Sequence, residues 1–333
     1  MKKQIIIKAA IVVLAAAIVL GAGIWILRNM EDNEYTETRG SMTEGFGQLK
    51  TIEWNGLTYR EKPAVTTLLI AGIDKQGDPE ATGSKTYRRG APADFLLLLA
   101  IDHTGKQIHQ LQIDRDTMTD VYVLGVFGNE VGSRVMQICL SHYYGDTLEA
   151  NAKSTIRSVQ SLLDGLEIDG WYMVDYGAIP VLNDALGGVK VHMDFDMTPV
   201  NPAWTKGSDV TLHGQEAEQF VRARMTVGSG TNQERMVRQG EYMTNAIRQM
   251  NKKISADISF GESLLESLEK IATTNMTTKR LAEELNQAYN YEILPIDHPE
   301  GEYTIGSDGY VEFHMKENAG TEWILEHLYT LPE

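Results

Sequence analysis

The sequence predicts an α/β fold of the α-β-α type, a single domain with a central mixed β-sheet, behind one N-terminal transmembrane helix. Short apolar runs at residues 66–71, 95–101 and 107–113 are typical of buried strands. Segments with apolar residues at helical spacing follow these runs, and an uncharged stretch covers residues 9–27. Strands and helices that alternate without an internal repeat favour one layered domain over a repeat array.

Each further element is predicted from the period of its apolar residues. After the three strands we expect helices at 148–163, 178–186 and 235–254, and strands at 171–174 and 189–193. Gly187 and Gly188 end the second helix, as glycine commonly does. Later segments indicate helices at 263–271, 278–286 and 321–329 and a strand pair within 303–315.

The first residues predict where the protein works. Residues 9–27 are long enough to cross a bilayer as a helix, and no clear cleavage site follows them, so an uncleaved anchor is favoured over a signal peptide. Lysines precede this stretch and acidic residues follow it, which places the N-terminus in the cytosol. We therefore expect a single-pass protein of the cell membrane with an extracytoplasmic domain.

The predicted domain organisation follows from these segments. Residues 1–30 form the cytosolic tip and the transmembrane anchor, and the polar residues 31–62 form an extracytoplasmic stalk. Residues 63–255 form the main domain, and residues 256–333 complete or cap it.

The charge of the chain limits its partners. The sequence has 46 acidic and 30 basic side chains and a net charge of −16. Such a surface repels nucleic acid, so a polyanionic ligand must be held by a local basic cluster. Cys139 is the one cysteine, which excludes an intrachain disulfide and favours a buried thiol.

Two carboxylates are expected to meet at one end of a hairpin. Residues 102–106 have the composition of a turn between two strands, and antiparallel pairing around that turn places Asp94 opposite Arg115 or Asp116. A nearby pair of carboxylates needs a cation between them, and oxygen ligands suit magnesium. The alternative is that Asp94 caps a strand and Asp116 begins a turn.

A cluster of arginines is the second candidate feature. Arg222, Arg224, Arg235 and Arg238 lie within seventeen residues of an acidic chain, and Gln239 follows directly. The planar guanidinium suits bidentate phosphate binding, so this stretch is a candidate phosphate clamp. The alternative is that these arginines neutralise neighbouring acidic side chains.

The motifs over residues 65–250 resemble those of LytR-CpsA-Psr proteins. They occur in the family's order behind an N-terminal anchor: Thr67-Leu68-Leu69-Ile70-Ala71-Gly72-Ile73-Asp74, Ala93-Asp94, Ile113-Asp114-Arg115-Asp116-Thr117, Asp184-Ala185-Leu186-Gly187-Gly188-Val189, Leu212-His213-Gly214-Gln215-Glu216-Ala217, Arg222-Ala223-Arg224 and Arg235-Met236-Val237-Arg238-Gln239. The resemblance implies an α/β domain with a groove for a polyprenyl lipid. It also implies an enzyme that transfers a phosphoglycan, such as teichoic acid or capsule, from polyprenyl pyrophosphate to peptidoglycan.

The resemblance also implies roles for individual residues. Asp94 and Asp116 match the aspartates that hold Mg²⁺, with Mn²⁺ as an alternative ion, and together with Arg115 they form the catalytic group. Pro92 and Phe95 stand where the family commonly has arginine and threonine, and Arg88 or Arg89 is expected to supply the missing cation. The residues that match or complete the pyrophosphate-binding set are Arg89, Arg222, Arg224, Arg235, Arg238 and Gln239.

Three functions stay open on the sequence. The first is the transferase, in which a peptidoglycan hydroxyl attacks the phosphorus bonded to the glycan and Asp94 is a candidate to accept the proton. The second is a non-catalytic, membrane-tethered receptor for polyprenyl-linked glycans, which the departures at Pro92 and Phe95 favour. The third is a hydrolase that uses water as the acceptor.

Overall fold

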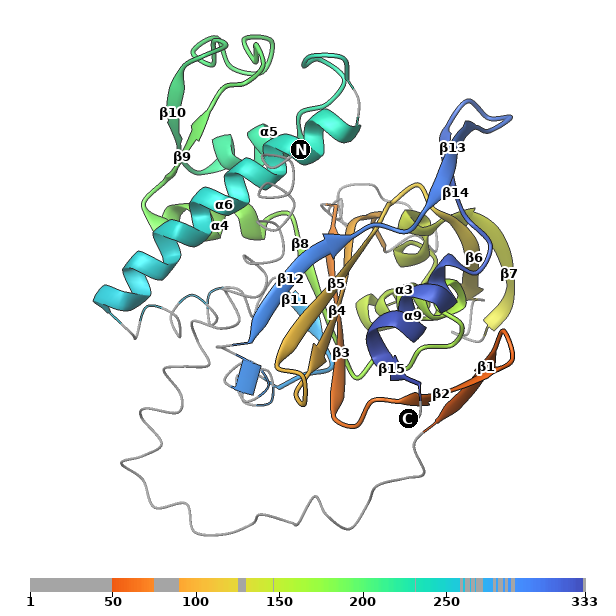
Figure 1. Ribbon diagram of the computed structural model, residues 1–333. Coiled ribbons are helices and arrows are strands. Elements are labelled where there is room, and N and C mark those ends of the chain that lie inside the picture. The colour runs from red at the N-terminus through yellow and green to blue at the C-terminus, as the bar shows by residue number, and fades with distance from the viewer. Residues whose placement is uncertain are drawn as a thin grey trace. The chain divides into compact units, whose positions relative to one another are not determined.

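A computed structural model of the protein describes residues 50–74, 90–124, 130–145, 147–230, 232–257, 272–277 and 291–331, together with single residues between 260 and 288 (Figure 1). The chain forms two compact units rather than the single domain that we expected. Among the described residues, the sheet unit comprises 50–174, 273–276 and 291–331, and the helical unit comprises 175–272 and 277–288. The chain leaves the sheet unit after residue 174, returns to it for residues 273–276, and returns again for residues 291–331.

The sheet unit contains a central mixed sheet, as predicted. Its six strands lie in the order β11-β8-β3-β4-β5-β12, with antiparallel pairs β3–β4 and β4–β5 and a parallel pair β5–β12. The strands span Ala272–Thr274 (β11), Gly170–Asp175 (β8), Val65–Ile73 (β3), Ala93–Asp102 (β4), Gln107–Ile113 (β5) and Glu292–Asp297 (β12).

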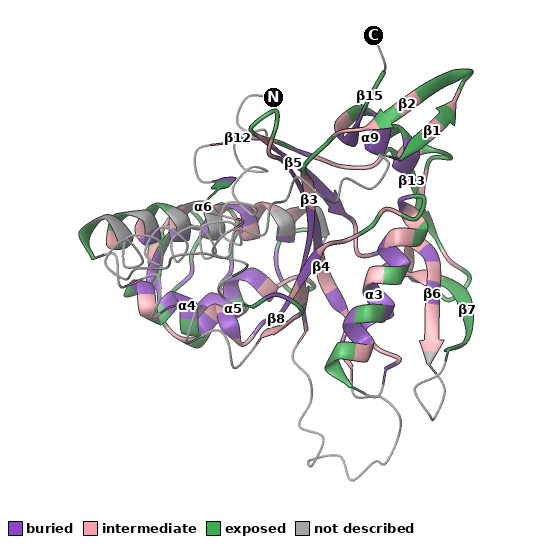
Figure 2. Cartoon of the chain, turned by 90° about the horizontal axis from the view of Figure 1, so that it is seen from below, coloured by how far each residue is buried: buried purple, intermediate pink, exposed green. Residues whose placement is uncertain are grey.

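Helices α3 (Leu148–Leu162) and α9 (Ala319–Leu328) contribute to the core of the sheet unit. Ala152 and Val159 of α3 and Ile324 of α9 belong to one buried cluster with Leu96 and Leu98 of β4. Buried residues run along β4 and one side of α3 (Figure 2). The helix predicted at residues 148–163 is thereby confirmed, and its apolar spacing is explained by this contact with the sheet.

The register of the β4–β5 hairpin positions the candidate site. Leu96 pairs with Ile113 and Asp102 pairs with Gln107, so continuing the register places Asp94 opposite Arg115, as predicted. The Asp102 carboxylate closes the turn by accepting hydrogen bonds from the backbone N–H groups of Thr104 and Gly105 at 3.0 and 2.7 Å.

The stalk predicted for residues 31–62 is wrong over the part that the structure describes. Strands β1 (Thr51–Trp54) and β2 (Leu57–Glu61) form a hairpin, and β15 (Tyr329–Thr330) extends it to three strands. Ile52, Trp54 and Tyr59 pack against the core cluster, so this segment is part of the folded unit. Asn55 and Gly56 have φ values of 49° and 76°, and this Asn-Gly pair is the sequence signal of a tight hairpin.

Of the extension predicted at residues 256–333, the part from residue 291 onward completes the sheet unit, while residues 256–272 belong to the helical unit. Strand β12 joins the central sheet beside β5, and β15 pairs with β2. The predicted strand pair is confirmed as β13 (Gly301–Ile305) and β14 (Val311–Met315). The hairpin of β6 (Met118–Leu124) and β7 (Glu130–Gln137) and the short helix η1 (Ile138–His142) were not predicted. Most of the helices predicted at 263–271 and 278–286 lies outside the described residues.

The helical unit confirms the elements predicted around Gly187. It contains α4 (Ala178–Leu186), β9 (Val189–His192), β10 (Asp209–Leu212), α5 (Gln215–Arg222) and α6 (Asn232–Ala256). Gly187 ends α4 with a φ of 85°, a conformation that favours glycine. The side chains of Trp204, Phe220 and Tyr242 are fully buried in this unit.

The structure does not test the predicted anchor. In the described residues no helix is both long and apolar enough to cross a bilayer, and the span predicted at residues 9–27 lies outside them.

Two buried histidines predict a pH-dependent stability. Burial lowers the pKa of His142 to about 4, although its ring donates a hydrogen bond to the Ala91 carbonyl, and burial likewise lowers the pKa of His109 to about 4. Since an unfolded histidine titrates near 6.5, unfolding below that pH takes up a proton that the folded protein does not bind. Stability is therefore lost as pH falls from about 6.5 to about 4. His142 alone should lower the free energy of unfolding by about 2 kcal/mol between pH 7 and pH 5.

Urea unfolding at pH 7 and pH 5 checks this expectation. The loss of stability between the two pH values should shrink in His142→Gln and in His109→Gln. The exposed His213, replaced by glutamine, is the matched control and should leave that loss nearly unchanged. An equal loss in wild type and His142→Gln would rule out His142 as a source.

Candidate active site

Asp94, Arg115 and Asp116 form one ion-paired group at an end of the central sheet. Asp94 lies at the start of β4, and Arg115 and Asp116 follow β5. The Arg115 Nη1 donates to Asp94 Oδ1, and the Arg115 Nε lies 3.3 Å from Asp116 Oδ1. The structure thus brings the two predicted carboxylates to the same guanidinium, and the cation between them is Arg115.

The surroundings of Arg115 keep it charged. Burial alone lowers the pKa of this guanidinium, but Cys139, Asp94 and Asp116 outweigh that effect and hold the pKa above its usual value. The Arg115 Nη2 also donates to Cys139 Sγ at 3.2 Å. Cys139 is buried, and burial is the main reason that its pKa rises to about 11, so the thiol is neutral at pH 7. The prediction of a buried thiol is confirmed.

Asp114 is a neighbouring residue that the sequence reasoning did not assign a role. Its Oδ1 accepts a hydrogen bond from the Asp116 backbone N–H at 2.9 Å, which fixes the turn that carries Arg115 and Asp116. Its Oδ2 accepts a hydrogen bond from the Tyr303 hydroxyl at 2.7 Å. Tyr303 is 189 residues away along the chain, so no local pattern could reveal this contact.

Arg238 and Gln239, predicted to bind pyrophosphate, contact backbone carbonyls at the end of α5. The Arg238 guanidinium donates to the carbonyls of Phe220 and Ala223, and the Gln239 amide donates to the Val221 carbonyl at 3.2 Å. Arg238 is 3% exposed, and this burial lowers its pKa. These two side chains hold the segment that contains Arg222 and Arg224. Arg235 is also buried.

Arg222 and Arg224 are more accessible. The Arg222 Nη1 donates to Glu218 Oε1 at 2.9 Å, and its guanidinium lies over the Tyr176 ring at 5.4 Å from the centroid. The Arg224 Nε donates to the Gly230 carbonyl at 3.2 Å. The alternative prediction, that arginines of this stretch pair with nearby acids, holds for Arg222. Arg89 lies outside the described residues.

The two residue sets belong to different units. Asp94, Arg115 and Asp116 lie in the sheet unit, and the range Arg222–Gln239 lies in the helical unit. Each set is well defined within its own unit. That both sets bind one ligand stays a prediction.

The carboxylates of Asp94 and Asp116 have the donor chemistry that a magnesium site requires. Mg²⁺ is commonly held by one or two carboxylates, with water and substrate phosphate oxygens completing its shell. Across the described residues no group of three or more histidine, cysteine, aspartate or glutamate side chains could hold a metal ion by itself. The predicted pair therefore fits an ion that arrives with, or is completed by, a phosphate ligand.

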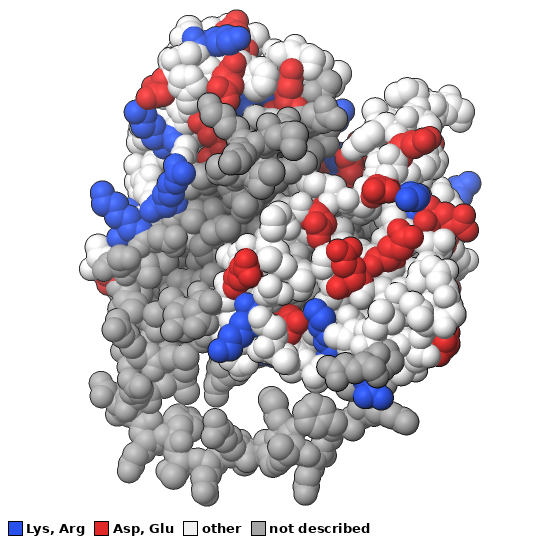
Figure 3. All heavy atoms as spheres, viewed as in Figure 1, with Lys and Arg blue, Asp and Glu red and all other residues white. Residues whose placement is uncertain are grey.

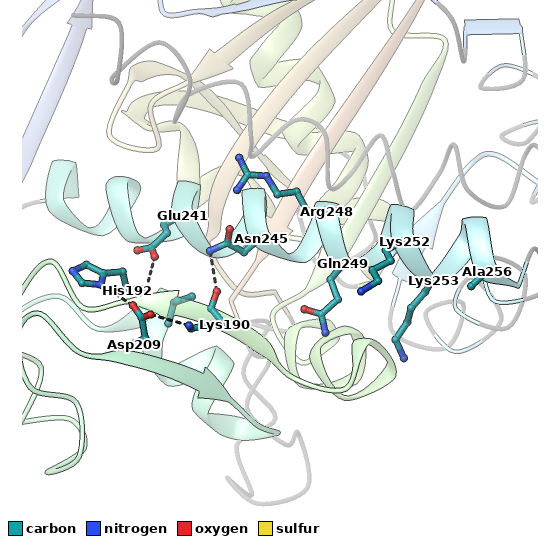
Figure 4. Close-up of a pocket in the computed structure, with 11 residues that line it drawn as sticks. Lys190, His192, Asp209, Glu241, Asn245, Arg248, Gln249, Lys252, Lys253 and Ala256 are labelled. Carbon is teal, nitrogen blue, oxygen red and sulfur yellow. Dashed lines mark hydrogen bonds and ion pairs between the residues drawn. The ribbon is translucent and has the colours of Figure 1, made fainter.

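A separate groove lies within the helical unit. It has a volume of about 680 Å³ and lies between α6 and the β9–β10 hairpin (Figure 4). Asp209 bridges Lys190 and His192 at 2.8 Å each and raises the pKa of His192. The predicted site residues are not part of its lining. Its lining also includes the basic residues Arg248, Lys252 and Lys253 of α6.

Comparison with known proteins settles the family. The LytR_cpsA_psr family model matches residues 32–319. The chain belongs to this family. Members of the LytR-CpsA-Psr family are typically anchored in the membrane and commonly depend on Mg²⁺.

Relatives of the chain in this family include teichoic acid transferases. The chain is 25% identical over 227 residues to the polyisoprenyl-teichoic acid–peptidoglycan teichoic acid transferase TagU of Halalkalibacterium halodurans. This match covers 67% of the chain and 65% of that relative's length.

Solved structures show the same fold. Protein gbs0355 from Streptococcus agalactiae has a TM-score of 0.59 and 19% identity, covering 78% of the chain and 85% of that structure. TagT bound to LI-WTA has a TM-score of 0.54 and 18% identity, covering 79% and 89%. TagU of B. subtilis has a TM-score of 0.51 and 20% identity, covering 79% and 94%. At these identities the likeness shows the α/β fold of the family with its central mixed sheet.

Proposed function

We propose that the protein transfers a phosphoglycan, such as teichoic acid or capsule, from a polyprenyl-pyrophosphate carrier to peptidoglycan at the outer face of the cell membrane. The observation that carries this proposal is the guanidinium of Arg115 held between Asp94 and Asp116 at an end of the sheet. Membership of the LytR-CpsA-Psr family and the similarity to a teichoic acid transferase support it.

The chemistry follows from the charges of this group. A sugar hydroxyl of peptidoglycan attacks the phosphorus bonded to the glycan, the new O–P bond forms, and the bond to polyprenyl phosphate breaks. Arg115 stabilises the negative charge that accumulates on the phosphate oxygens, because a fixed cation needs no rearrangement during the reaction. Asp94 is the proposed acceptor of the proton of the attacking hydroxyl, a role that requires that it is not fully committed to the metal ion, and polyprenyl phosphate leaves.

A divalent ion would supply further charge neutralisation. Asp94 and Asp116 would hold Mg²⁺, or Mn²⁺, together with phosphate oxygens of the substrate. Arg115 orients both carboxylates, since it contacts an oxygen of each. Before the pyrophosphate binds, Arg115 and the metal ion therefore compete for the carboxylates of Asp94 and Asp116.

The arginines of the helical unit divide into two roles. Arg222 and Arg224 are proposed to contact the pyrophosphate directly, with Arg89 adding a further cation. Arg238 and Gln239 act through their hydrogen bonds to carbonyls of residues 220–223, which position the segment that carries the first two arginines. Arg235 stays in the proposed pyrophosphate set.

A reaction with separated substrates tests this function. The chain from residue 50 onward is incubated with labelled polyprenyl-pyrophosphate glycan, with peptidoglycan, or with both. The proposal predicts labelled peptidoglycan and polyprenyl phosphate only when both substrates are present. Release of polyprenyl phosphate without peptidoglycan would identify a hydrolase. Binding of the labelled glycan without any turnover would identify a receptor, which the departure at Pro92 and Phe95 from the family pattern favours.

A further inference from the structure

The β13–β14 hairpin is attached directly to the turn that carries the candidate catalytic residues. The Phe313 backbone N–H donates to the Asp116 carbonyl at 2.8 Å, and Thr117 forms a parallel bridge with Phe313. The Gln137 amide donates to the Val311 carbonyl at 3.1 Å. The base of the hairpin is thus held beside Asp116, and its far end extends away from the rest of the sheet unit (Figure 1).

The hairpin has one apolar and one polar face. Tyr303 pairs with Phe313 and Ile305 with Val311, and because strand side chains alternate, these residues share a face. The opposite face carries Glu302, Thr304, Glu312 and His314. A two-stranded ribbon is only marginally stable by itself, and it is stabilised when its apolar face packs against another surface.

Among the described residues, the apolar face is buried at its base and exposed beyond it. Phe313 is 5% exposed, whereas Tyr303 is 56% and Ile305 is 68% exposed. Tyr310, just before β14, is 64% exposed. Exposed aromatic and aliphatic side chains gathered on one protruding element are typical of a binding surface.

The exposed face is on the same side as the candidate catalytic turn. The Tyr303 hydroxyl, which belongs to that face, donates to Asp114 Oδ2, and Asp114 Oδ1 holds the Asp116 backbone N–H. The Tyr303 ring also lies against Phe313, with centroids 4.8 Å apart. A ligand that covers Tyr303 and Ile305 would therefore end next to Arg115 and Asp116.

The charges of the hairpin decide what kind of ligand fits. Its acidic residues include Glu302, Asp308 and Glu312, while Lys316 at its base is paired with Glu300 at 3.0 Å. The visible face of the sheet unit is also mainly acidic (Figure 3). This charge repels a phosphate-bearing glycan and an anionic lipid surface. Sugar rings without phosphate combine apolar C–H faces with hydroxyl rims, which suit tyrosine rings beside carboxylates.

We propose that the apolar face of the β13–β14 hairpin, with Tyr303 and Ile305, and the exposed Tyr310 at the far end of the hairpin bind the acceptor as a phosphate-free glycan strand and guide its hydroxyl to the Arg115–Asp116 turn. This inference rests on the proposed transferase function and adds the site of its second substrate. Tyr303 couples the two regions, since it belongs to the binding face and also contacts Asp114.

A double variant at the end of the hairpin tests the inference. Ile305→Ser with Tyr310→Ser removes exposed apolar area without touching Asp114. The expected result is a KM for peptidoglycan at least tenfold higher, with the KM for the lipid-linked donor and the kcat at saturating acceptor nearly unchanged. Val131→Ser with Val135→Ser is the matched control, because these valines are 62% and 64% exposed on β7 of the same unit. The control should keep the wild-type KM for peptidoglycan.

Several results would overturn the inference. An unchanged KM for peptidoglycan in the hairpin variant would show that this face of the hairpin does not bind the acceptor. A raised KM for the donor alone would assign the hairpin to the phosphoglycan, and loss of binding to anionic lipid vesicles alone would assign it to the membrane. Sedimentation of the protein with peptidoglycan in the absence of donor separates this inference from the proposed function. Suppose that the wild-type protein sediments with peptidoglycan but has no transferase activity, and that the hairpin variant does not sediment with peptidoglycan. The proposed binding surface would then be supported, and the proposed transferase function would be contradicted.

Discussion

Replacing Arg115 with lysine is expected to reduce the rate of glycan transfer by about 10² to 10³, the usual cost of losing one group that stabilises charge in the transition state. Arg115 contacts Asp94, Asp116 and Cys139 through three different nitrogen atoms. A lysine ammonium is a single point charge and cannot keep all three contacts. The measurement is the steady-state rate with labelled donor at saturating peptidoglycan.

Arg134→Lys is the matched control for this substitution. Arg134 is an exposed residue of β7 in the same unit, so its replacement should leave both the transfer rate and the melting temperature unchanged. Arg115→Lys keeps one positive charge beside the carboxylates, so its melting temperature should fall only slightly. A transfer rate equal to that of wild type would show that Arg115 has a structural role only.

Arg238 and Arg224 are expected to respond to substitution in different ways. Arg238→Met removes a buried donor and leaves the carbonyls of Phe220 and Ala223 without this partner. Leaving buried acceptors unsatisfied should lower the free energy of unfolding by about 2 kcal/mol, and transfer should fall with it. Arg224→Met should reduce transfer by about 10²-fold with little loss of stability, because this side chain has a single hydrogen bond to Gly230 among those described.

Urea unfolding and transfer rates, measured on both variants, check this division. Arg248→Met on the exposed side of α6 is the matched control and should change neither quantity. Equal loss of stability in both variants would contradict the assignment of Arg238 to positioning and Arg224 to binding. Unchanged transfer in Arg224→Met would remove that residue from the proposed pyrophosphate set.

Local patterns predicted the hairpin that builds the acidic pair. The turn at 102–106 and the alternation of the flanking strands were enough to set the register, because antiparallel pairing follows from the position of the turn. Helices α3, α4 and α6 were predictable for a similar reason, since the apolar spacing of a helix reflects the face that it buries.

Contacts between distant parts of the chain were not predictable. The sequence gives no sign that β12 joins β5, that Tyr303 meets Asp114, or that Arg238 points at carbonyls of α5. The sequence pattern around an arginine does not show whether its guanidinium binds a phosphate or backbone carbonyl oxygens. The β1–β2 hairpin is a different case, because Asn55-Gly56 did carry a readable signal between two short alternating runs.

The position of Arg115 between the two carboxylates has a physical explanation. Two carboxylates at one edge of a sheet need a nearby cation to remain ionised together, and a guanidinium satisfies that need without any bound ion. The predicted pair of carboxylates indicated that a cation lies beside them, and the contacts of Arg115 show that its guanidinium is such a cation.

The proposed function requires that one pyrophosphate contacts the Asp94–Arg115–Asp116 group and Arg224 at the same time. A crystal structure of the chain from residue 50 onward, in complex with a short-chain polyprenyl pyrophosphate and Mg²⁺, tests it most directly. We expect phosphate oxygens within hydrogen-bond distance of the guanidiniums of both Arg115 and Arg224. A pyrophosphate bound elsewhere, with neither guanidinium in contact, would contradict it.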